Sequence, residues 1–335
     1  MKDISKYLAL RYSEYTTIKR SATRLIKSIE NLHSYLSSLS KIDKSFGILL
    51  SGGMDSALLA SYLPEGTKAF TFKYDNNFAK EEYERAKNFA KINNLQLIDV
   101  YINWDTIKNT IDPLIMRRQA PIATIEPQLY IACETAKQYD VSRLIIGGDA
   151  DIVFGGMSKM LSKDWTKEDF IQFYRYLDPK EILKEPDEIY LKAFDNYWDA
   201  KREKFMTVDF INDIYNTESI ISYTNAFGLA KMKLFDPYED LAFNYDIAKI
   251  REKPKYLIQE LFIKQYNFEP PEKNPMPRPV DFYEELNEYP TSDVFRDDID
   301  YSKLTGQQKW MIYCVDRYIK LFPGMAKEIE RNTSW

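Results

Sequence analysis

The sequence predicts an α/β protein in which a parallel sheet is flanked by helices and followed by an additional, mostly helical C-terminal region. Two observations predict this fold class. Between residues 46 and 147, short continuous apolar runs typical of buried parallel strands alternate with stretches of helical spacing. Residues 158–335 contain no comparable run and are interrupted by prolines, most densely from Pro270 to Pro279. Strands that alternate with helices imply parallel pairing through right-handed crossovers.

The elements of the predicted sheet follow one another along the chain. Strands are expected at residues 46–50, 69–74, 95–102 and 143–146. Helices are expected at residues 55–63, 79–92, 104–116 and 128–139. Pro64 and Gly66 stop the first of these helices. Ligands of such sheets bind at the carboxyl ends of the strands, so we expect the site there.

We divide the chain into three parts. Residues 1–45 read as a helical N-terminal segment that packs against the main domain, and residues 46–157 form the α/β core. Residues 158–335 form a mostly helical region that covers the ligand edge of the sheet and completes the substrate site.

Composition excludes several classes of protein. The chain has 335 residues, 44% hydrophobic and 29% charged, which is typical of a globular protein. A single histidine, His33, excludes a metal site built from several histidines, and two cysteines are too few for a zinc ribbon. The net charge of −5 disfavours nucleic acid as a partner. No apolar run approaches the ~20 residues that span a bilayer, and no signal peptide follows Met1, so we expect a cytoplasmic protein without a membrane partner.

Glycine is scarce, and seven of the 11 glycines stand in or beside two short stretches. The first stretch is Ser51-Gly52-Gly53-Met54-Asp55-Ser56, between a predicted strand and a predicted helix. The glycines allow a tight turn that directs backbone N–H groups inward, and a helix N-terminus favours anions, so this loop suits phosphate. Asp55 repels phosphate unless Mg²⁺ bridges the two. No lysine follows as a Walker A loop requires.

The pattern S-G-G-x-D-S resembles the PP-loop of the N-type ATP pyrophosphatases, which cleave ATP between the α and β phosphates. The second glycine stretch, from Ile145 to Met157, contains Gly-Gly-Asp-Ala-Asp-Ile-Val-Phe-Gly-Gly. It resembles the G-x-G-x-D-x-x-F-G-G stretch in the synthetase domain of asparagine synthetases and of their relatives that close β-lactam rings. Weaker matches follow at Pro127, at Pro237-Tyr238-Glu239-Asp240, at Lys255 before an apolar helix, and from Pro271 to Phe282.

The resemblance implies an adenine nucleotide alpha hydrolase-like, Rossmann-like fold with ATP and Mg²⁺ as cofactors. It implies that the loop residues hold pyrophosphate, namely Ser51, Gly52, Gly53, Asp55 and Ser56. Leu49, Phe72 and Gly147 match positions that contact adenosine, with Gly148 beside them. Asp55 and Asp151 would share the metal, as two carboxylates at neighbouring strand ends can.

The sequence departs from the family at two positions. The family has a proton-handling Glu or Tyr where this chain has Gly148, and Asp149 next to it can act as a base, ligate a metal or cap a turn. The family also uses a lysine late in the matched region to neutralise charge in the transition state. The aligned position here is nearest Pro279, with Arg278 beside it and Lys273 upstream, and we predict Arg278 as that cation.

The function expected from these residues is ATP-dependent ligation. The enzyme would adenylate a small-molecule carboxylate, release pyrophosphate and form an amide. The segment before the loop is too short for the family's glutaminase domain, so nitrogen would come from ammonia, a separate amidotransferase partner or an amine substrate. The aromatic-rich region offers Tyr223, Asn225, Phe227 and Tyr238 as pocket residues or core residues. Two alternatives stay open: a PP-loop enzyme that modifies tRNA, and a nucleotide-binding module with a degenerate site.

Overall fold

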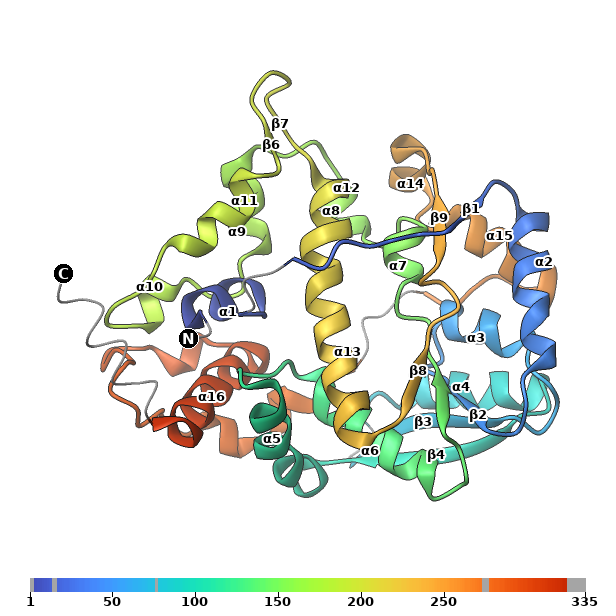
Figure 1. Ribbon diagram of the computed structural model, residues 1–335, viewed down its shortest axis with the longest axis horizontal. Coiled ribbons are helices and arrows are strands. Elements are labelled where there is room, and N and C mark those ends of the chain that lie inside the picture. Colours follow the sequence, from blue (N-terminus) through green and yellow to red (C-terminus); the bar gives the residue numbers. More distant parts are fainter. Residues whose placement is uncertain (1–2, 14–16, 76–77, 273–276, 324–335) are drawn as a thin grey trace.

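The computed structural model describes residues 3–13, 17–75, 78–272 and 277–323 (Figure 1). Its centre is a five-stranded parallel sheet in the order β4-β3-β2-β5-β8. The strands are β2 (Phe46–Leu49), β3 (Lys68–Tyr74), β4 (Gln96–Ile102), β5 (Arg143–Ile145) and β8 (Lys233–Phe235). The predicted fold class, a parallel sheet flanked by helices, is confirmed.

The strand order places the carboxyl ends of β2 and β5 side by side. The chain runs from β2 outward to β3 and β4, and then crosses back to β5 on the other side of β2. Ile48 of β2 is in register with Ala69 of β3 and with Ile145 of β5. Such a reversal opens a crevice at the carboxyl edge of a sheet. Both glycine stretches follow these two strands, so they meet at this crevice.

Four helices connect the strands within a few residues of the predicted bounds. They are α3 (Met54–Ala60), α4 (Lys80–Ile92), α5 (Trp104–Arg118) and α6 (Ile125–Lys137). The start of α5 is fixed by a capping box, in which Asn103 accepts the Thr106 N–H and Thr106 accepts the Asn103 N–H. The apolar periodicity therefore located these helices correctly.

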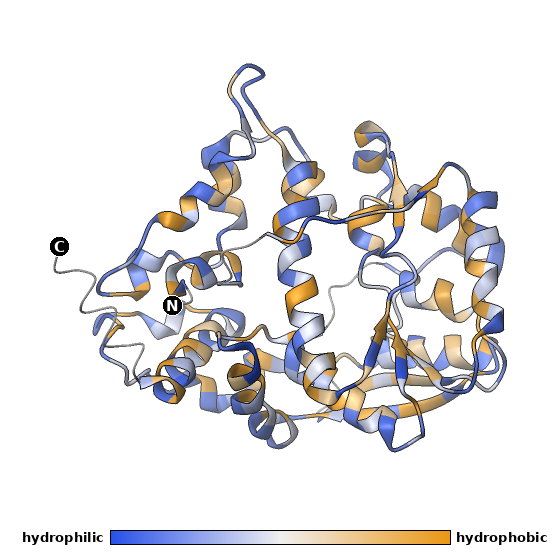
Figure 2. Cartoon of the chain, in the orientation of Figure 1, coloured by the Kyte–Doolittle hydropathy of each residue, from blue (hydrophilic) through white to orange (hydrophobic). Residues whose placement is uncertain are grey.

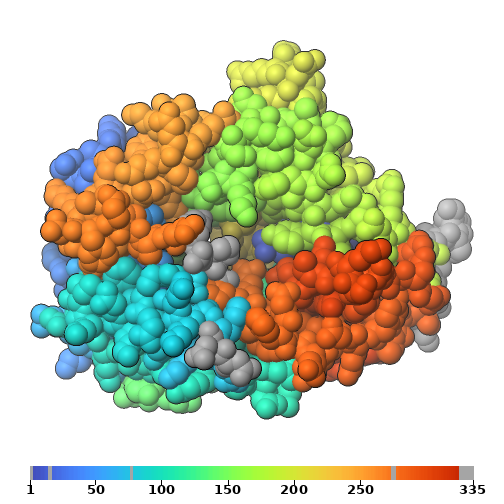
Figure 3. Space-filling model, turned by 180° about the vertical axis from the view of Figure 1, so that it is seen from behind, coloured from blue at the N-terminus to red at the C-terminus, as the bar shows by residue number. Residues whose placement is uncertain are grey.

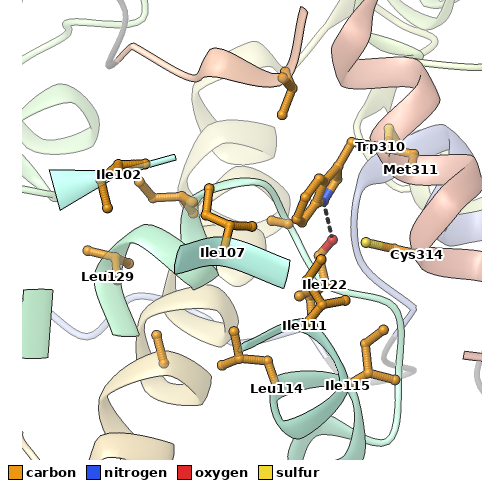
Figure 4. Packing of buried hydrophobic residues seen from close by; sticks show 14 of the residues in the cluster. Ile102, Ile107, Ile111, Leu114, Ile115, Ile122, Leu129, Trp310, Met311 and Cys314 are labelled. Atoms are coloured by element: carbon orange, nitrogen blue, oxygen red, sulfur yellow. Dashed lines mark hydrogen bonds between the residues drawn. The ribbon is translucent and has the colours of Figure 1, made fainter. Parts of the chain in front are cut away.

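Two apolar layers cover the sheet. Alternate residues of β2 point to opposite faces. Ile48 packs with residues of α2 (Ile29–Leu36), α3, α4 and α15 (Tyr256–Tyr266), and Leu49 packs with residues of α5, α6 and α16 (Gly306–Leu321). Figure 4 shows part of the second layer, where the Trp310 indole N–H donates to the Ile122 carbonyl at 3.1 Å. Figure 2 shows the central strands in largely hydrophobic colours and the turn between β6 (Trp198–Asp199) and β7 (Lys204–Phe205) in hydrophilic ones.

The C-terminal region is mostly helical, and α13 runs through the middle of the molecule (Figure 1). The short helix α7 (Ala150–Val153) ends the α/β core, and the helices of the C-terminal region are α8 (Ser158–Leu161), α9 (Lys167–Tyr174), α10 (Pro179–Ile182), α11 (Lys192–Asp195), α12 (Thr207–Phe210), α13 (Asn216–Ala230), α14 (Ile247–Glu252), α15 (Tyr256–Tyr266) and α16 (Gly306–Leu321). Short 3₁₀ or π turns are η1 (Ser37–Lys41), η3 (Ile189–Leu191), η4 (Ile211–Tyr215), η5 (Pro279–Phe282), η6 (Glu284–Asn287) and η7 (Tyr301–Lys303). A separate aromatic core supports this region, with Phe170, Phe194, Phe205 and Phe210 fully buried.

The C-terminal region also contributes strands that the sequence analysis did not predict. The edge strand β8 belongs to the central sheet, β6 (Trp198–Asp199) pairs antiparallel with β7 (Lys204–Phe205), and β9 (Leu241–Phe243) pairs with the N-terminal segment. The three residues of β8 are exposed or half-buried, so they form no apolar run. The pairing of β8 with β5 depends on tertiary contacts, so the sequence of β8 itself does not predict a strand.

The N-terminal segment is not helical throughout. It contains α1 (Ile4–Leu10), the strand β1 (Arg24–Ile26) and α2 (Ile29–Leu36). β1 pairs in parallel with β9, and the Arg20 side chain donates to the Tyr238, Glu239 and Leu241 carbonyls. Before β1 the backbone bonds to distant segments: the Thr23 N–H donates to the Asp240 carbonyl, and the Ile18 N–H donates to the Thr217 hydroxyl oxygen. No helix among the described residues is long and apolar enough to cross a bilayer.

Candidate active site

The loop of residues 51–56 turns directly after β2. Gly52 has φ 74°, and a Cβ there would overlap the Glu82 carbonyl oxygen, so only glycine fits. The Ser51 and Ser56 hydroxyls lie 3.0 Å apart, and the Ser51 and Gly53 N–H groups donate to them. The hydroxyls therefore hold the loop in shape, and Ser51, Asp55 and Ser56 line a cavity above it.

Asp55 and Asp151 meet at a third residue, Lys255. The Lys255 Nζ lies 2.5 Å from Asp55 Oδ2 and 2.5 Å from Asp151 Oδ1, so these two oxygens are no more than 5.0 Å apart. The lysine side chain is 3% exposed, whereas the carboxylates are about one-quarter exposed toward the cavity. Burial alone lowers the pKa of Lys255, but the two aspartates outweigh burial and raise it. The ammonium group is therefore charged. We call these three residues the acidic edge.

Lys255 is a functional candidate that the sequence analysis noted only as the residue before an apolar helix. It stands just ahead of α15 with φ 54°, a strained left-handed conformation that aims its side chain back at the sheet. A Cβ at Gly156 would overlap Asp151 Oδ1 and Lys255 Cε. Gly156, the last glycine of the second stretch, thus leaves room for the Lys255 side chain because it has no Cβ. The sequence signal for Lys255 is a lysine that follows Pro254 at the start of a helix. This signal is weak, because the two aspartates that the lysine contacts lie far away in the sequence.

The acidic edge opens into a cavity of about 730 Å³ at the carboxyl ends of β2 and β5. This volume lies in the usual range for small-molecule sites. Figure 3 shows the molecule from behind, where distant segments of the chain meet around a depression. Predicted site residues that line the cavity are Leu49, Ser51, Asp55, Ser56, Phe72, Gly147, Gly148, Asp151 and Arg278. Gly52, Gly53 and Asp149 are not among its lining residues.

Tyr223 occupies the space that a side chain at position 148 would take. A Cβ on Gly148 would lie 2.8 Å from Tyr223 Cε2, 3.0 Å from its Oη and 3.2 Å from Asp236 Oδ2. Tyr223 comes from α13 and lines the cavity. Burial raises the pKa of the Tyr223 phenol, so it is a neutral hydroxyl at neutral pH. The other aromatic-region candidates, Asn225, Phe227 and Tyr238, are buried and do not line the cavity.

The Asp149 carboxylate is engaged away from the cavity. It pairs with the Arg20 guanidinium at 3.1 Å, and the Asp149 N–H donates to Asp236 Oδ2 at 2.9 Å. Burial raises the pKa of Asp149, and the Arg20 charge opposes that rise. Burial and the neighbouring Asp149 raise the pKa of Asp236 well above its ordinary value. Asp149 stands at the N-cap of α7 without a side-chain capping bond, and its role as a base or metal ligand stays a prediction.

Arg278 lies at the start of η5 and lines the same cavity. Within the described residues no ion pair joins it to Asp55 or Asp151, and its role as the transition-state cation stays a prediction. Lys273 lies outside the described residues. The carboxylate oxygens of Asp55 and Asp151 suit a hard cation such as Mg²⁺. No group of three or more His, Cys, Asp or Glu side chains among the described residues could hold a metal. The two aspartates fit Mg²⁺ only if further ligands, such as phosphate oxygens, complete its coordination.

These features define an α/β protein with a glycine-rich loop after its first sheet strand and an acidic pair at the strand ends. Residues 37–219 match the family model described as asparagine synthase, which spans more than half of the chain. The protein therefore belongs to the asparagine synthase family, the synthetase domain of the PP-loop enzymes. A search of curated proteins found no match. Lys255 and Arg278 both lie beyond the matched residues.

Proposed function

We propose that the protein is an ATP-dependent carbon–nitrogen ligase that adenylates a substrate carboxylate, releases pyrophosphate and then forms an amide. Membership of the asparagine synthase family supports a synthetase of this general kind. The observation that carries the specific reaction is the acidic edge, where Lys255 lies between Asp55 and Asp151 beside the phosphate loop. We propose ATP and Mg²⁺ as its cofactors.

Each group of the acidic edge has a task in adenylation. Asp55 and Asp151 would hold Mg²⁺, which offsets the charge of the phosphate oxygens when bound. The carboxylate oxygen of the substrate attacks the α-phosphorus, and the bond to the pyrophosphate oxygen breaks. Negative charge builds on the phosphates in this step, and a fixed cation in a water-poor site stabilises it. Lys255 supplies a charged, buried ammonium group there, whereas our sequence prediction assigned this task to Arg278.

The second step forms the amide. A nitrogen nucleophile attacks the acyl carbon, AMP leaves, and the nitrogen loses a proton. We propose that the Tyr223 hydroxyl orients the nucleophile and relays this proton, because it stands where the family has its proton-handling side chain. Leu49, Phe72 and Gly147 would contact the adenosine. The nitrogen source is free ammonia, the product of a separate amidotransferase or an amine on a substrate.

Product analysis tests this function. The full-length protein is incubated with ATP, Mg²⁺, ammonium and a panel of carboxylates, and nucleotide and phosphate products are separated. We expect AMP and pyrophosphate in equal amounts. Asp55→Asn and Asp151→Asn should abolish both products, while Asp140→Asn, an exposed aspartate after α6, should not. Formation of ADP and phosphate would contradict the proposal, and absence of ATP binding would favour a degenerate module.

A further inference from the structure

An extended segment of the N-terminal region crosses α13 and then pairs with β9, as the blue ribbon in Figure 1 shows. It consists of residues 17–26, which we call the N-terminal strap. The residues of the strap are exposed, except for Arg20 and Ile26. The Arg20 side chain is only 9% exposed. An exposed segment that withdraws one arginine from solvent has placed that residue against specific partners.

The Arg20 guanidinium makes four hydrogen bonds to two separate parts of the chain. Its Nε donates to Asp149 Oδ2 at 3.1 Å, which ties it to the second glycine stretch. Its Nη1 donates to the Leu241 carbonyl at 2.6 Å, and its Nη2 donates to the Tyr238 and Glu239 carbonyls at 2.7 Å and 2.5 Å. A guanidinium is planar and its donors have fixed directions, so these bonds set the second glycine stretch relative to residues 238–241. We call this set of bonds the Arg20 clamp.

Both parts of the chain that the clamp joins lead to the acidic edge. Asp151 follows Asp149 by two residues and lies in the first turn of α7. On the other side, the Tyr238 side chain is fully buried, and its hydroxyl donates to the Asp55 carbonyl at 3.3 Å. Arg20 therefore connects the two aspartates of the acidic edge through one intermediate residue on each side.

The strap is anchored through its backbone on both sides of Arg20. Before Arg20, the Ile18 N–H donates to the Thr217 hydroxyl oxygen of α13 at 2.8 Å. After Arg20, the Thr23 N–H donates to the Asp240 carbonyl at 2.9 Å, and β1 pairs with β9. These bonds do not involve the Arg20 side chain, so a substitution at position 20 removes the clamp and leaves the strap in place.

We infer that Arg20 is a positioning residue of the ligation reaction, which holds Asp55 and Asp151 at the spacing that binds Mg²⁺ together with ATP. The inference rests on the proposed function, because these aspartates hold the metal only in that function. It also assigns a task to the Asp149 carboxylate, as the anion that Arg20 contacts. Arg20 and residues 238–241 lie outside residues 37–219, so the match to the family does not include the clamp.

Equilibrium binding of ATP with and without saturating Mg²⁺ tests the clamp without requiring catalysis. The full-length wild type is compared with Arg20→Ala and with Arg24→Ala, a matched change in the strap whose guanidinium lies over the Tyr35 ring. We expect the factor by which Mg²⁺ strengthens ATP binding to fall about tenfold in Arg20→Ala, as is typical when the support of a metal ligand is lost. ATP affinity without Mg²⁺ should stay unchanged, and Arg24→Ala should match the wild type.

Chemical rescue separates positioning from a general loss of structure. Millimolar guanidinium chloride can fill the space that the side chain leaves and remake its bonds. It should restore the magnesium effect in Arg20→Ala, whereas sodium chloride at the same concentration should not. Arg20→Lys keeps a cation beside Asp149 but lacks the planar fork that reaches the three carbonyls. It should lose part of the magnesium effect, and it carries the test if Arg20→Ala does not fold.

The outcomes separate the clamp from the proposed function. An unchanged magnesium effect in the folded Arg20 variants overturns the clamp alone. Weaker ATP binding both with and without Mg²⁺, with no recovery in guanidinium, also overturns it, because Arg20 would then only stabilise the fold. If Mg²⁺ does not strengthen ATP binding in the wild type, the proposed function and the clamp are both wrong.

Discussion

The two ends of the cavity differ in how their charges are satisfied. At the acidic edge, Lys255 lies 2.5 Å from an oxygen of each aspartate, so one of the two negative charges is balanced within the protein. At the wall lined by Arg11, Arg278 and Gln307, called the basic wall, Arg278 has no acidic partner among the described residues and three side-chain donors lack acceptors. The side chains of the first end are thus held by one another, whereas donors of the second end stay unpaired.

This difference suits the acidic edge to catalysis and the basic wall to substrate recognition. Electrostatic catalysis requires groups that are already fixed when charge develops, because reorganisation during the reaction would cost rate. Recognition instead gains specificity from donors that stay unpaired with the wrong ligand. The acidic edge has the first property, and the basic wall has the second. Changes at the acidic edge should therefore affect rate, and changes at the basic wall should affect which substrate binds.

The largest expected effect follows from Lys255→Met. The variant keeps the length of the side chain but removes the charge that would face the phosphates. We expect pyrophosphate release to fall by about 10²–10³-fold. The two aspartates would also face each other without a shared cation, so the melting temperature should fall. Lys253→Met, an exposed lysine two residues earlier, controls for the loss of a nearby charge. A wild-type rate in Lys255→Met would show that the cation is elsewhere, for example at Arg278.

Tyr223→Phe should affect only the second step. Adenylation does not need the hydroxyl, so acyl-adenylate should still form and accumulate. Amide formation should slow by about 10²-fold, as for loss of a proton-handling group. Asp149→Asn is the companion variant, because the sequence placed that residue in the same role. If amide formation slowed in Asp149→Asn but not in Tyr223→Phe, the proton-handling role would belong to Asp149. Single-turnover measurement of AMP and amide separates the two steps.

Gly156→Ala should disturb the acidic edge through packing. The added Cβ would overlap Asp151 Oδ1 and Lys255 Cε, and overpacking typically costs about 1–3 kcal/mol. Denaturant unfolding measures the free energy of unfolding, and pyrophosphate release should fall in parallel because the lysine is displaced. Unchanged stability and rate would mean that the lysine does not pass over Gly156.

The smallest effect concerns the pH dependence of stability near Gly148. Burial and Asp149 raise the folded-state pKa of Asp236, so Asp236 retains its proton at pH values where the unfolded chain has lost it. Its contribution to stability is therefore full below about pH 4 and declines as pH rises toward the folded-state pKa. The Asp236→Asn variant lacks this titratable carboxyl group. Relative to wild type, we expect its free energy of unfolding to rise by up to about 1.4 kcal/mol per pH unit above pH 4. If the difference in free energy of unfolding between the variant and the wild type did not vary with pH, the pKa of Asp236 would not be raised.

The fold was largely predictable from the sequence, because the strands between residues 46 and 145 carry local apolar signals, most clearly the continuous apolar run of β2. The edge strand β8 was not, since it is three residues long and partly exposed. The glycine-rich loop of residues 51–56 was recognisable for the same local reason, as its glycines and Asp55 lie within four residues, and its phosphate-binding role stays a prediction. The sequence named Tyr223 as a pocket or core residue, and the structure places it at the cavity. Lys255 was noted only as the residue before an apolar helix, because its partners Asp55 and Asp151 lie far away in the sequence.

Asp55 and Asp151 are proposed to hold a magnesium–nucleotide complex at the carboxyl edge of the sheet. Equilibrium binding of ATP with and without Mg²⁺ tests this role, in the wild type, Asp55→Asn, Asp151→Asn and the Asp140→Asn control. We expect Mg²⁺ to strengthen ATP binding in the wild type and the control, and to have little effect in the other two variants. The same magnesium dependence in all four proteins would rule out this role of the two aspartates.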